Sequence, residues 1–179
     1  MEKERKVKSK KLNLACERDI KKGYINSDLY NFEGVDIYFD FNNFPYPFKD
    51  NELDEIRAMR ILEYSESIVK VMEEFYRICK NKAIIKINVP ASPSPNSFQD
   101  PRFKVHFTYN TFTYFERKGG TDDKAFKPHF KILKREYIFS ESKLKFLNFL
   151  PNIFPKFYTR FLFMIFPSDR LYFELEVKK

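Results

Sequence analysis

Glycine, cysteine, histidine and tryptophan are all scarce in this chain of 179 residues. It contains four glycines, two cysteines, two histidines and no tryptophan. Since glycine adopts backbone conformations that other residues avoid, each of the few glycines should mark a constrained position. Cys16 and Cys79 share no metal-binding or redox spacing and sit in apolar contexts, which predicts two reduced, packed thiols and no metal site. Such cysteine usage is typical of a cytoplasmic protein.

Long hydrophobic runs are missing as well. The longest aromatic and aliphatic run covers residues 161–166, far short of the roughly 20 residues that a bilayer requires. The first apolar run, residues 12–16, is too short for a signal peptide. The Phe-rich stretch 144–166 is interrupted by prolines and basic residues, so it is either a cap packed on its own domain or an interfacial amphipathic segment. We therefore expect at most peripheral membrane contact.

The charge is strongly positive but unevenly distributed. The net charge is +8, and much of the excess lies in residues 1–10. This segment is interpreted as a solvated basic tail, with a non-specific anchor for phosphates or anionic lipid as the alternative. No cluster of basic residues interleaves with aromatic residues as in nucleic-acid modules, so no sequence-specific nucleic-acid binding is expected. Residues 11–179 are predicted to form one domain, with a cap insertion at about 140–168.

Hydrophobic periodicity indicates the secondary structure. Apolar residues at three- and four-residue spacing predict a helix over residues 67–80, and shorter helices are expected at 59–64 and 111–117. The predicted strands are residues 11–15, 24–29, 34–39, 53–58, 83–89, 126–139 and 170–177. Strands that alternate with helices up to residue 89, followed by two late strands, favour an α/β fold with a mostly parallel sheet.

Five segments carry motif-like patterns in a fixed order. They are LNLACE at residues 12–17, GYINSD at 23–28, DFNNFPYPF at 40–48, DNELDEI at 50–56 and ILEY at 61–64. They resemble, in turn, the motifs L-N-L-G-C-G, G-W-I-N-V-D, D-L-x-x-x-P-Y/F-P-F, D-N-S-F-D-E-I and V-L-E-H. In these motifs, and in the ending of the chain, the sequence is similar to class I S-adenosylmethionine-dependent methyltransferases of the small type 11 kind.

The resemblance implies a fold, a cofactor and a reaction. The fold would be a Rossmann-like methyltransferase sheet, mostly parallel with an antiparallel C-terminal strand, and with helices on both faces. The cofactor would be S-adenosylmethionine, whose methyl group passes in line to a small-molecule, glycan or lipid-linked acceptor. The implied cofactor-binding residues are Asn13, Ala15, Cys16, Glu17, Asp28, Leu29, Asp40 and Phe41. Asp28 would accept hydrogen bonds from the ribose hydroxyls, and Asp40 with Phe41 would meet the adenine, although Phe41 could equally be core.

Three residues depart from the family pattern. Ala15 and Glu17 replace glycines of the first motif, and Tyr64 replaces the usual histidine. Glu17 adds bulk near the methionine end of the cofactor, where its charge would repel the carboxylate and attract the ammonium or sulfonium group. These departures keep a second hypothesis open: a catalytically inactive methyltransferase-like binding or partner subunit. A homo-oligomer is also left open.

The acceptor side is less defined. The residues that lie where the family covers its acceptor pocket are Asp100, Arg102, His106, Tyr109 and Tyr114. The candidate catalytic residues are His106, whose titration range suits a general base, and Tyr64, which is a poor base at neutral pH. His106 could instead pack among the neighbouring aromatic residues. A third hypothesis is a basic surface-binding protein that uses residues 3–11 and the Phe-rich cap at membranes or phosphates.

Overall fold

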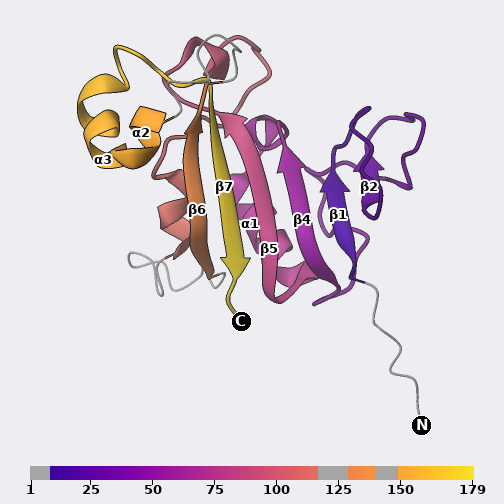
Figure 1. Cartoon of the computed structure of the whole chain (residues 1–179). Coiled ribbons are helices and arrows are strands. Elements are labelled where there is room, and N and C mark those ends of the chain that lie inside the picture. Colours follow the sequence, from indigo (N-terminus) through magenta and orange to yellow (C-terminus); the bar gives the residue numbers. More distant parts are fainter. Residues whose placement is uncertain (1–8, 117–128, 140–148) are drawn as a thin grey trace.

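The computed structural model describes residues 9–116, 129–139 and 149–179, and its strands form one sheet (Figure 1). The order is β3-β2-β1-β4-β5-β7-β6. The strands are β1 Lys11–Leu14, β2 Ile25–Asp28, β3 Ile37–Tyr38, β4 Leu53–Met59, β5 Cys79–Pro90, β6 Phe130–Ile138 and β7 Arg170–Val177. Neighbours from β3 to β5 are parallel, whereas β7 runs antiparallel to both β5 and β6. The predicted mostly parallel sheet with an antiparallel C-terminal strand is confirmed.

The helix α1 (Ile68–Ile78) covers one face of this sheet, and it matches the helix predicted over 67–80. It begins after Ser67, whose side chain accepts a hydrogen bond from the Lys70 N–H. Its apolar stripe is fully buried and consists of Val71, Met72, Phe75 and Ile78. The same core receives alternate residues of β7, so the period-2 pattern of residues 170–177 is confirmed too.

The opposite face of the sheet is polar. Figure 1 shows α1 behind β4, β5 and β7, and in the parts of the chain described no helix crosses in front of these strands or of β1. The carboxylate of Glu55 accepts a hydrogen bond from the Tyr24 hydroxyl at 2.5 Å and from Lys86 Nζ at 2.8 Å, and Lys11 Nζ lies 3.2 Å away. We expected helices on both faces. Charged and phenolic side chains cover the second face instead, because they tolerate water.

The connection from β1 to β2 explains this difference. Parallel strands usually need a crossover of a dozen or more residues containing a helix, but residues 15–24 form only turns and bends. Buried amides hold this crossover in place. The Asn13 side-chain amide donates to the Asp19 carbonyl at 2.8 Å and to Asn26 Oδ1 at 3.0 Å. Arg57 donates to Asn13 Oδ1 at 2.9 Å and pairs with Asp19 at 2.8 Å.

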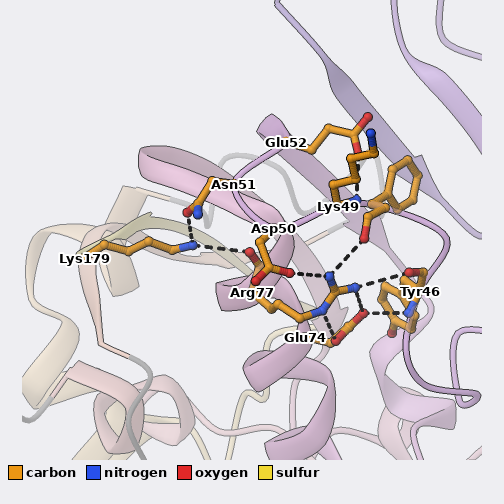
Figure 2. Close-up of polar contacts among 9 residues, drawn as sticks. Tyr46, Lys49, Asp50, Asn51, Glu52, Glu74, Arg77 and Lys179 are labelled. Atoms are coloured by element: carbon orange, nitrogen blue, oxygen red, sulfur yellow. Dashed lines mark hydrogen bonds and ion pairs between the residues drawn. The ribbon is translucent and has the colours of Figure 1, made fainter.

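An arginine-centred network fixes the amino-terminal end of β4 to α1 (Figure 2). Arg77 binds both carboxylate oxygens of Glu74, at 2.5 and 2.9 Å, and Asp50 at 2.7 Å. Its guanidinium also donates to the carbonyls of Tyr46 and Phe48. The network therefore holds the proline-rich loop before β4 against the last turn of α1, at the end of the sheet remote from the carboxyl ends of the parallel strands.

A cap joins β6 to β7 through short helical turns. They are α2 (Phe149–Ile153), α3 (Pro155–Phe157) and the π-helical η5 (Tyr158–Leu162). Residues 140–148 of the predicted cap insertion lie outside the described residues, as does most of the basic tail. Three 3₁₀ turns also lie in the described residues: η1 Leu62–Tyr64, η2 Pro95–Ser97 and η3 Thr111–Glu116. Across the residues described, no helix has the length and apolar character needed to cross a membrane.

Candidate functional site at the carboxyl ends of the parallel strands

The carboxyl ends of β1, β2, β3 and β4 meet at one edge of the sheet. In open α/β sheets this edge is where ligands bind, because the loops there can separate and expose backbone groups. Most of the residues predicted to bind the cofactor lie in the loops that leave these strands. The residues predicted to bind the cofactor therefore lie mostly at one place in the fold.

The loop after β1 has the backbone of a glycine loop without containing glycine. Ala15 has φ of 49° and Glu17 has φ of 47°, in the left-handed region that costs a residue with a side chain about 1–2 kcal/mol. The two residues stand at the two glycine positions of the motif. The Glu17 N–H donates to Asp28 Oδ2 at 2.7 Å, and its side chain is exposed. The buried Cys16 lies between them and donates its N–H to the Ser27 carbonyl at 2.9 Å.

Asp28 ends β2 and is buried, with 5% of its surface exposed. Its Oδ2 accepts the Glu17 N–H, and its Oδ1 accepts the Tyr30 N–H at 3.0 Å. Each carboxylate oxygen can accept a second hydrogen bond, so the group keeps acceptor capacity. Leu29, the next residue, is 54% exposed and leaves an apolar side chain open beside it.

The remaining predicted cofactor residues have different surroundings. Asp40 follows β3, is half-buried, and its Oδ1 accepts the Asn42 N–H at 2.9 Å. Phe41 is buried in the core, and its carbonyl accepts the Tyr46 hydroxyl at 2.6 Å. Asn13 uses its side-chain amide within the β1–β2 crossover. Phe41 and Asn13 thus support the edge from inside the sheet, and a direct cofactor contact from either stays a prediction.

A bridge connects the loop after β3 with the end of β4. The Asn42 side chain donates to the Tyr64 carbonyl at 3.4 Å and accepts the Glu66 N–H at 2.9 Å. Tyr64 in turn donates its hydroxyl to Asp100 Oδ2 at 2.9 Å, in the loop after β5. Arg102 pairs with Asp100 at 2.7 Å and lies over the Tyr64 ring. These contacts link the loops of β3, β4 and β5 into one wall.

The wall determines the protonation of Tyr64. Burial and the hydrogen bond to Asp100 raise the pKa of Tyr64 to about 12. The hydrogen bonds from Arg102 hold the pKa of Asp100 well below its usual range. The phenol is therefore protonated at neutral pH and acts as a donor, which agrees with its description as a poor base.

Of the predicted acceptor-side residues, Asp100 and Arg102 contact Tyr64, whereas His106, Tyr109 and Tyr114 have other surroundings. His106 is exposed, and its ring lies 4.6 Å from that of Phe98. No hydrogen bond joins its imidazole to another described residue. Tyr109 stacks on Tyr137 of β6 at 4.7 Å, so it supports the cap, and Tyr114 is exposed on η3. Within the ranges described, no group of histidine, cysteine or acidic side chains could hold a metal ion.

Glu63 is a residue of this edge whose burial the sequence did not reveal. It lies in η1 between Leu62 and Tyr64, is 2% exposed, and its Oε2 has no hydrogen-bond partner. Burial raises the pKa of Glu63 to about 7, against the opposing charges of Arg170 and Arg60. A glutamate beside leucine in a short helical segment gives no signal of burial, because either side of such a turn can face water.

Comparison with solved structures identifies the fold. A S-adenosylmethionine-dependent methyltransferase from Archaeoglobus fulgidus matches 96% of this chain and 87% of its own, with a TM-score of 0.60 and 16% identity. A Haloferax volcanii protein solved in complex with the Trm112 methyltransferase activator matches 96% of this chain and 84% of its own, with a TM-score of 0.59 and 13% identity. The chain therefore has the Rossmann-like fold of class I methyltransferases.

The same fold also carries other chemistry. The cyclase SpnF matches 95% of this chain and 75% of its own, with a TM-score of 0.58 and 13% identity. No protein-family model and no curated protein sequence matches the chain. Since one fold hosts several activities, the reaction has to be argued from the residues at the edge of the sheet.

Proposed function

We propose that this protein binds S-adenosylmethionine at the carboxyl ends of β1, β2 and β3 and transfers its methyl group to an acceptor. The observation that carries the proposal is the conformation of the β1 loop. Ala15 and Glu17 keep left-handed backbones at both glycine positions, and the Glu17 N–H is fixed on Asp28. A strained backbone persists only where the surrounding structure holds it, and such strain concentrates at functional sites.

The residues of the edge fit the cofactor in chemical type. Asp28 has acceptor capacity for the ribose hydroxyls, and the exposed Leu29 offers an apolar surface for the adenine. Asp40 has an Oδ2 outside its turn hydrogen bond that suits an exocyclic amine. When bound, the cofactor supplies an electrophilic methyl group. The residues of this chain have to bind it, orient the acceptor and exclude water.

The acceptor is proposed to be a small molecule, a glycan or a lipid-linked group that reaches the wall of Tyr64 and Asp100. Tyr64 would orient the acceptor through its ring or hydroxyl and would not remove a proton, since its pKa is about 12. His106 remains the candidate base because it is exposed in the segment after β5 that also carries Asp100. Two buried free cysteines, Cys16 and Cys79, fit a cytoplasmic location for this reaction.

Isothermal titration of the full chain with S-adenosylmethionine tests the proposal. Binding by the wild-type protein is expected, and Asp28→Ala should weaken it by at least about tenfold because the carboxylate makes charge-assisted hydrogen bonds. Asp50→Ala is the matched control, since this exposed carboxylate lies at the opposite end of the sheet. A folded wild-type protein that does not bind at millimolar cofactor would contradict the proposal.

A second candidate function is a catalytically inactive partner subunit. Glu17 favours it, because a carboxylate at the methionine end of the site would repel the cofactor carboxylate. One structural neighbour was solved together with a methyltransferase activator, which shows that this fold enters such complexes. Glu17→Gly and Glu17→Gln separate the causes: the first removes bulk and charge, the second only charge. A gain in affinity of about tenfold or more with Glu17→Gly would support the inactive subunit, and unchanged tight binding would remove its main support.

A further inference from the structure

The cap between β6 and β7 exposes large apolar side chains. Six of them are between 53 and 77% exposed, and they define the apolar face of the cap: Phe154, Phe157, Phe161, Met164, Ile165 and Phe166. Phe157 and Phe161 lie one helical turn apart, with ring centroids 5.1 Å from each other. Single exposed apolar residues are common, but a contiguous exposed group marks an interaction surface.

The exposure of this face does not come from a loosely attached cap. The inner side chains of the cap, Tyr158 and Phe163, are buried against Tyr137 of β6 at 4.7 and 5.3 Å between ring centroids. The Asn152 side chain accepts the Tyr137 N–H and donates to its carbonyl, both at 2.9 Å, and Thr159 meets the Tyr137 hydroxyl at 2.7 Å. The cap is therefore fixed through one side while the apolar face points away from the protein.

In the described residues of the cap, 149–168, all charged side chains are basic. Lys156 and Arg160 lie one turn apart on the same segment and are exposed. No aspartate or glutamate occurs from residue 149 to 168. Neither cation has an acidic partner among the residues described. Segments that lie in the interface of a membrane typically combine exposed aromatic side chains with neighbouring basic residues, as this short helical segment does.

We propose that the cap docks on the surface of an anionic lipid bilayer, with the apolar face at the acyl boundary and Lys156 and Arg160 at the headgroups. A second copy of the chain is a poorer occupant. Self-association about a two-fold axis would bring the two pairs of cations together without a compensating charge. The anionic surface of a bilayer complements these cations and covers the aromatic residues at once.

The cap lies at the same end of the molecule as the candidate cofactor site. It leaves the sheet after Ile138 and returns at Arg170, which pairs with both Ile138 and Pro90, the last residue of the parallel strand β5. Figure 1 shows α2 and α3 beside the upper ends of β6 and β7, where the parallel strands finish. Docking through the cap would thus bring that edge close to the bilayer. The docking proposal does not depend on methyl transfer, because it needs neither cofactor nor acceptor.

Vesicle co-sedimentation of the full chain tests the docking. Phosphatidylcholine vesicles are compared with vesicles that also contain phosphatidylserine, at low and at high salt. The wild-type protein should bind the anionic vesicles more tightly and lose part of this binding in high salt. Phe157→Ser/Phe161→Ser should weaken binding to anionic vesicles at least about tenfold. Lys156→Gln/Arg160→Gln should lower the affinity for anionic vesicles about tenfold and leave binding to phosphatidylcholine vesicles unchanged.

The control is Val69→Ser/Lys70→Gln, which removes an adjacent exposed apolar residue and cation from α1 and should bind as the wild type does. Thermal melting of each variant checks that the fold is retained. Full vesicle binding by both cap variants would overturn the proposal, because the basic tail would then be the anchor. Dimers in sedimentation equilibrium that Phe157→Ser/Phe161→Ser abolishes, without vesicle binding, would also overturn it in favour of a second copy as occupant.

Discussion

Glu63 places a carboxyl group inside the protein where its ionisation is costly. The groups that face it are Arg170 from β7, Arg60 from the end of β4 and Asp100 from the loop after β5. Burial outweighs the two arginines, so the pKa in the folded protein is raised to about 7 from the ordinary 4.5. The protonated form thus stabilises the fold fully below pH 4.5, and this stabilisation is lost as the pH rises through about 7.

Glu63→Gln should remove this pH dependence. The free energy of unfolding of the variant, relative to the wild type, should rise by roughly 3 kcal/mol between pH 4.5 and a pH above 7, since only the wild type has to ionise a buried group. Urea unfolding across this range measures the difference. Glu66→Gln, at an exposed carboxylate in the following turn, should run parallel to the wild type. A constant difference for Glu63→Gln would show that the buried carboxyl does not titrate with folding.

At the level of elements, α1 depends on contacts outside its own apolar stripe. Glu74 is buried on the helix, and its carboxylate accepts the Tyr46 N–H at 2.6 Å as well as the guanidinium of Arg77. Figure 2 shows how the arginine lies between this carboxylate and Asp50. A buried carboxylate that loses its cation costs more than an exposed pair contributes.

Arg77→Ala is expected to lower the free energy of unfolding by about 2 kcal/mol, less than for a fully buried pair because the arginine is partly exposed. Lys10→Ala breaks the exposed pair with Glu52 and should change stability by less than about 1 kcal/mol. Chemical denaturation of both variants compares them directly. Equal losses would mean that the Arg77 network is no more than a surface ion pair.

Elements with a strong period could be predicted from the sequence, and so could the absence of a helix between residues 15 and 24, but the contacts that hold this connection could not. The stripe of α1 and the alternation of β7 are local patterns, so their positions were found within a few residues. The β1–β2 crossover without a helix depends on the buried amides of Asn13 and Asn26 meeting across the sheet. Such contacts join residues far apart in the chain, and a local pattern does not contain them.

The candidate site was predictable to a similar extent. Its location followed from the ordered motifs, because loops after parallel strands meet at one edge. The left-handed backbones of Ala15 and Glu17 could not be read from their residue types, which normally avoid that region. The burial of Glu63 could not be read from its sequence neighbours either, and its carbonyl accepts the Lys104 N–H from the loop after β5, about 40 residues away, at 2.8 Å.

For the whole molecule, α1 covers one face of the sheet, and the outermost strand on one side, β3, has only two residues. β5 and β7 pair along seven residue pairs near the other end and contribute fully buried side chains to the core. β2 and β3 share two pairs and have no helix in their connections within the described chain. Stability is therefore expected to be uneven across the sheet.

Hydrogen exchange should reveal this unevenness. Amides of β5 and β7, such as those of Ile85 and Phe173, should exchange more than about a hundredfold more slowly than those of β3, because they open only with global unfolding. Mass spectrometry or NMR can resolve the two regions. Equal protection of Ile37 and Phe173 would indicate that the sheet unfolds as a single unit.

The left-handed backbones of the β1 loop have a consequence for how this sequence can change over time. Codons for alanine and for glutamate each become glycine codons by one base change. Because Ala15 and Glu17 already hold the torsions that glycine would adopt, either change requires no movement of the chain. Single point mutations can therefore introduce the two glycines of the motif while the loop keeps its shape.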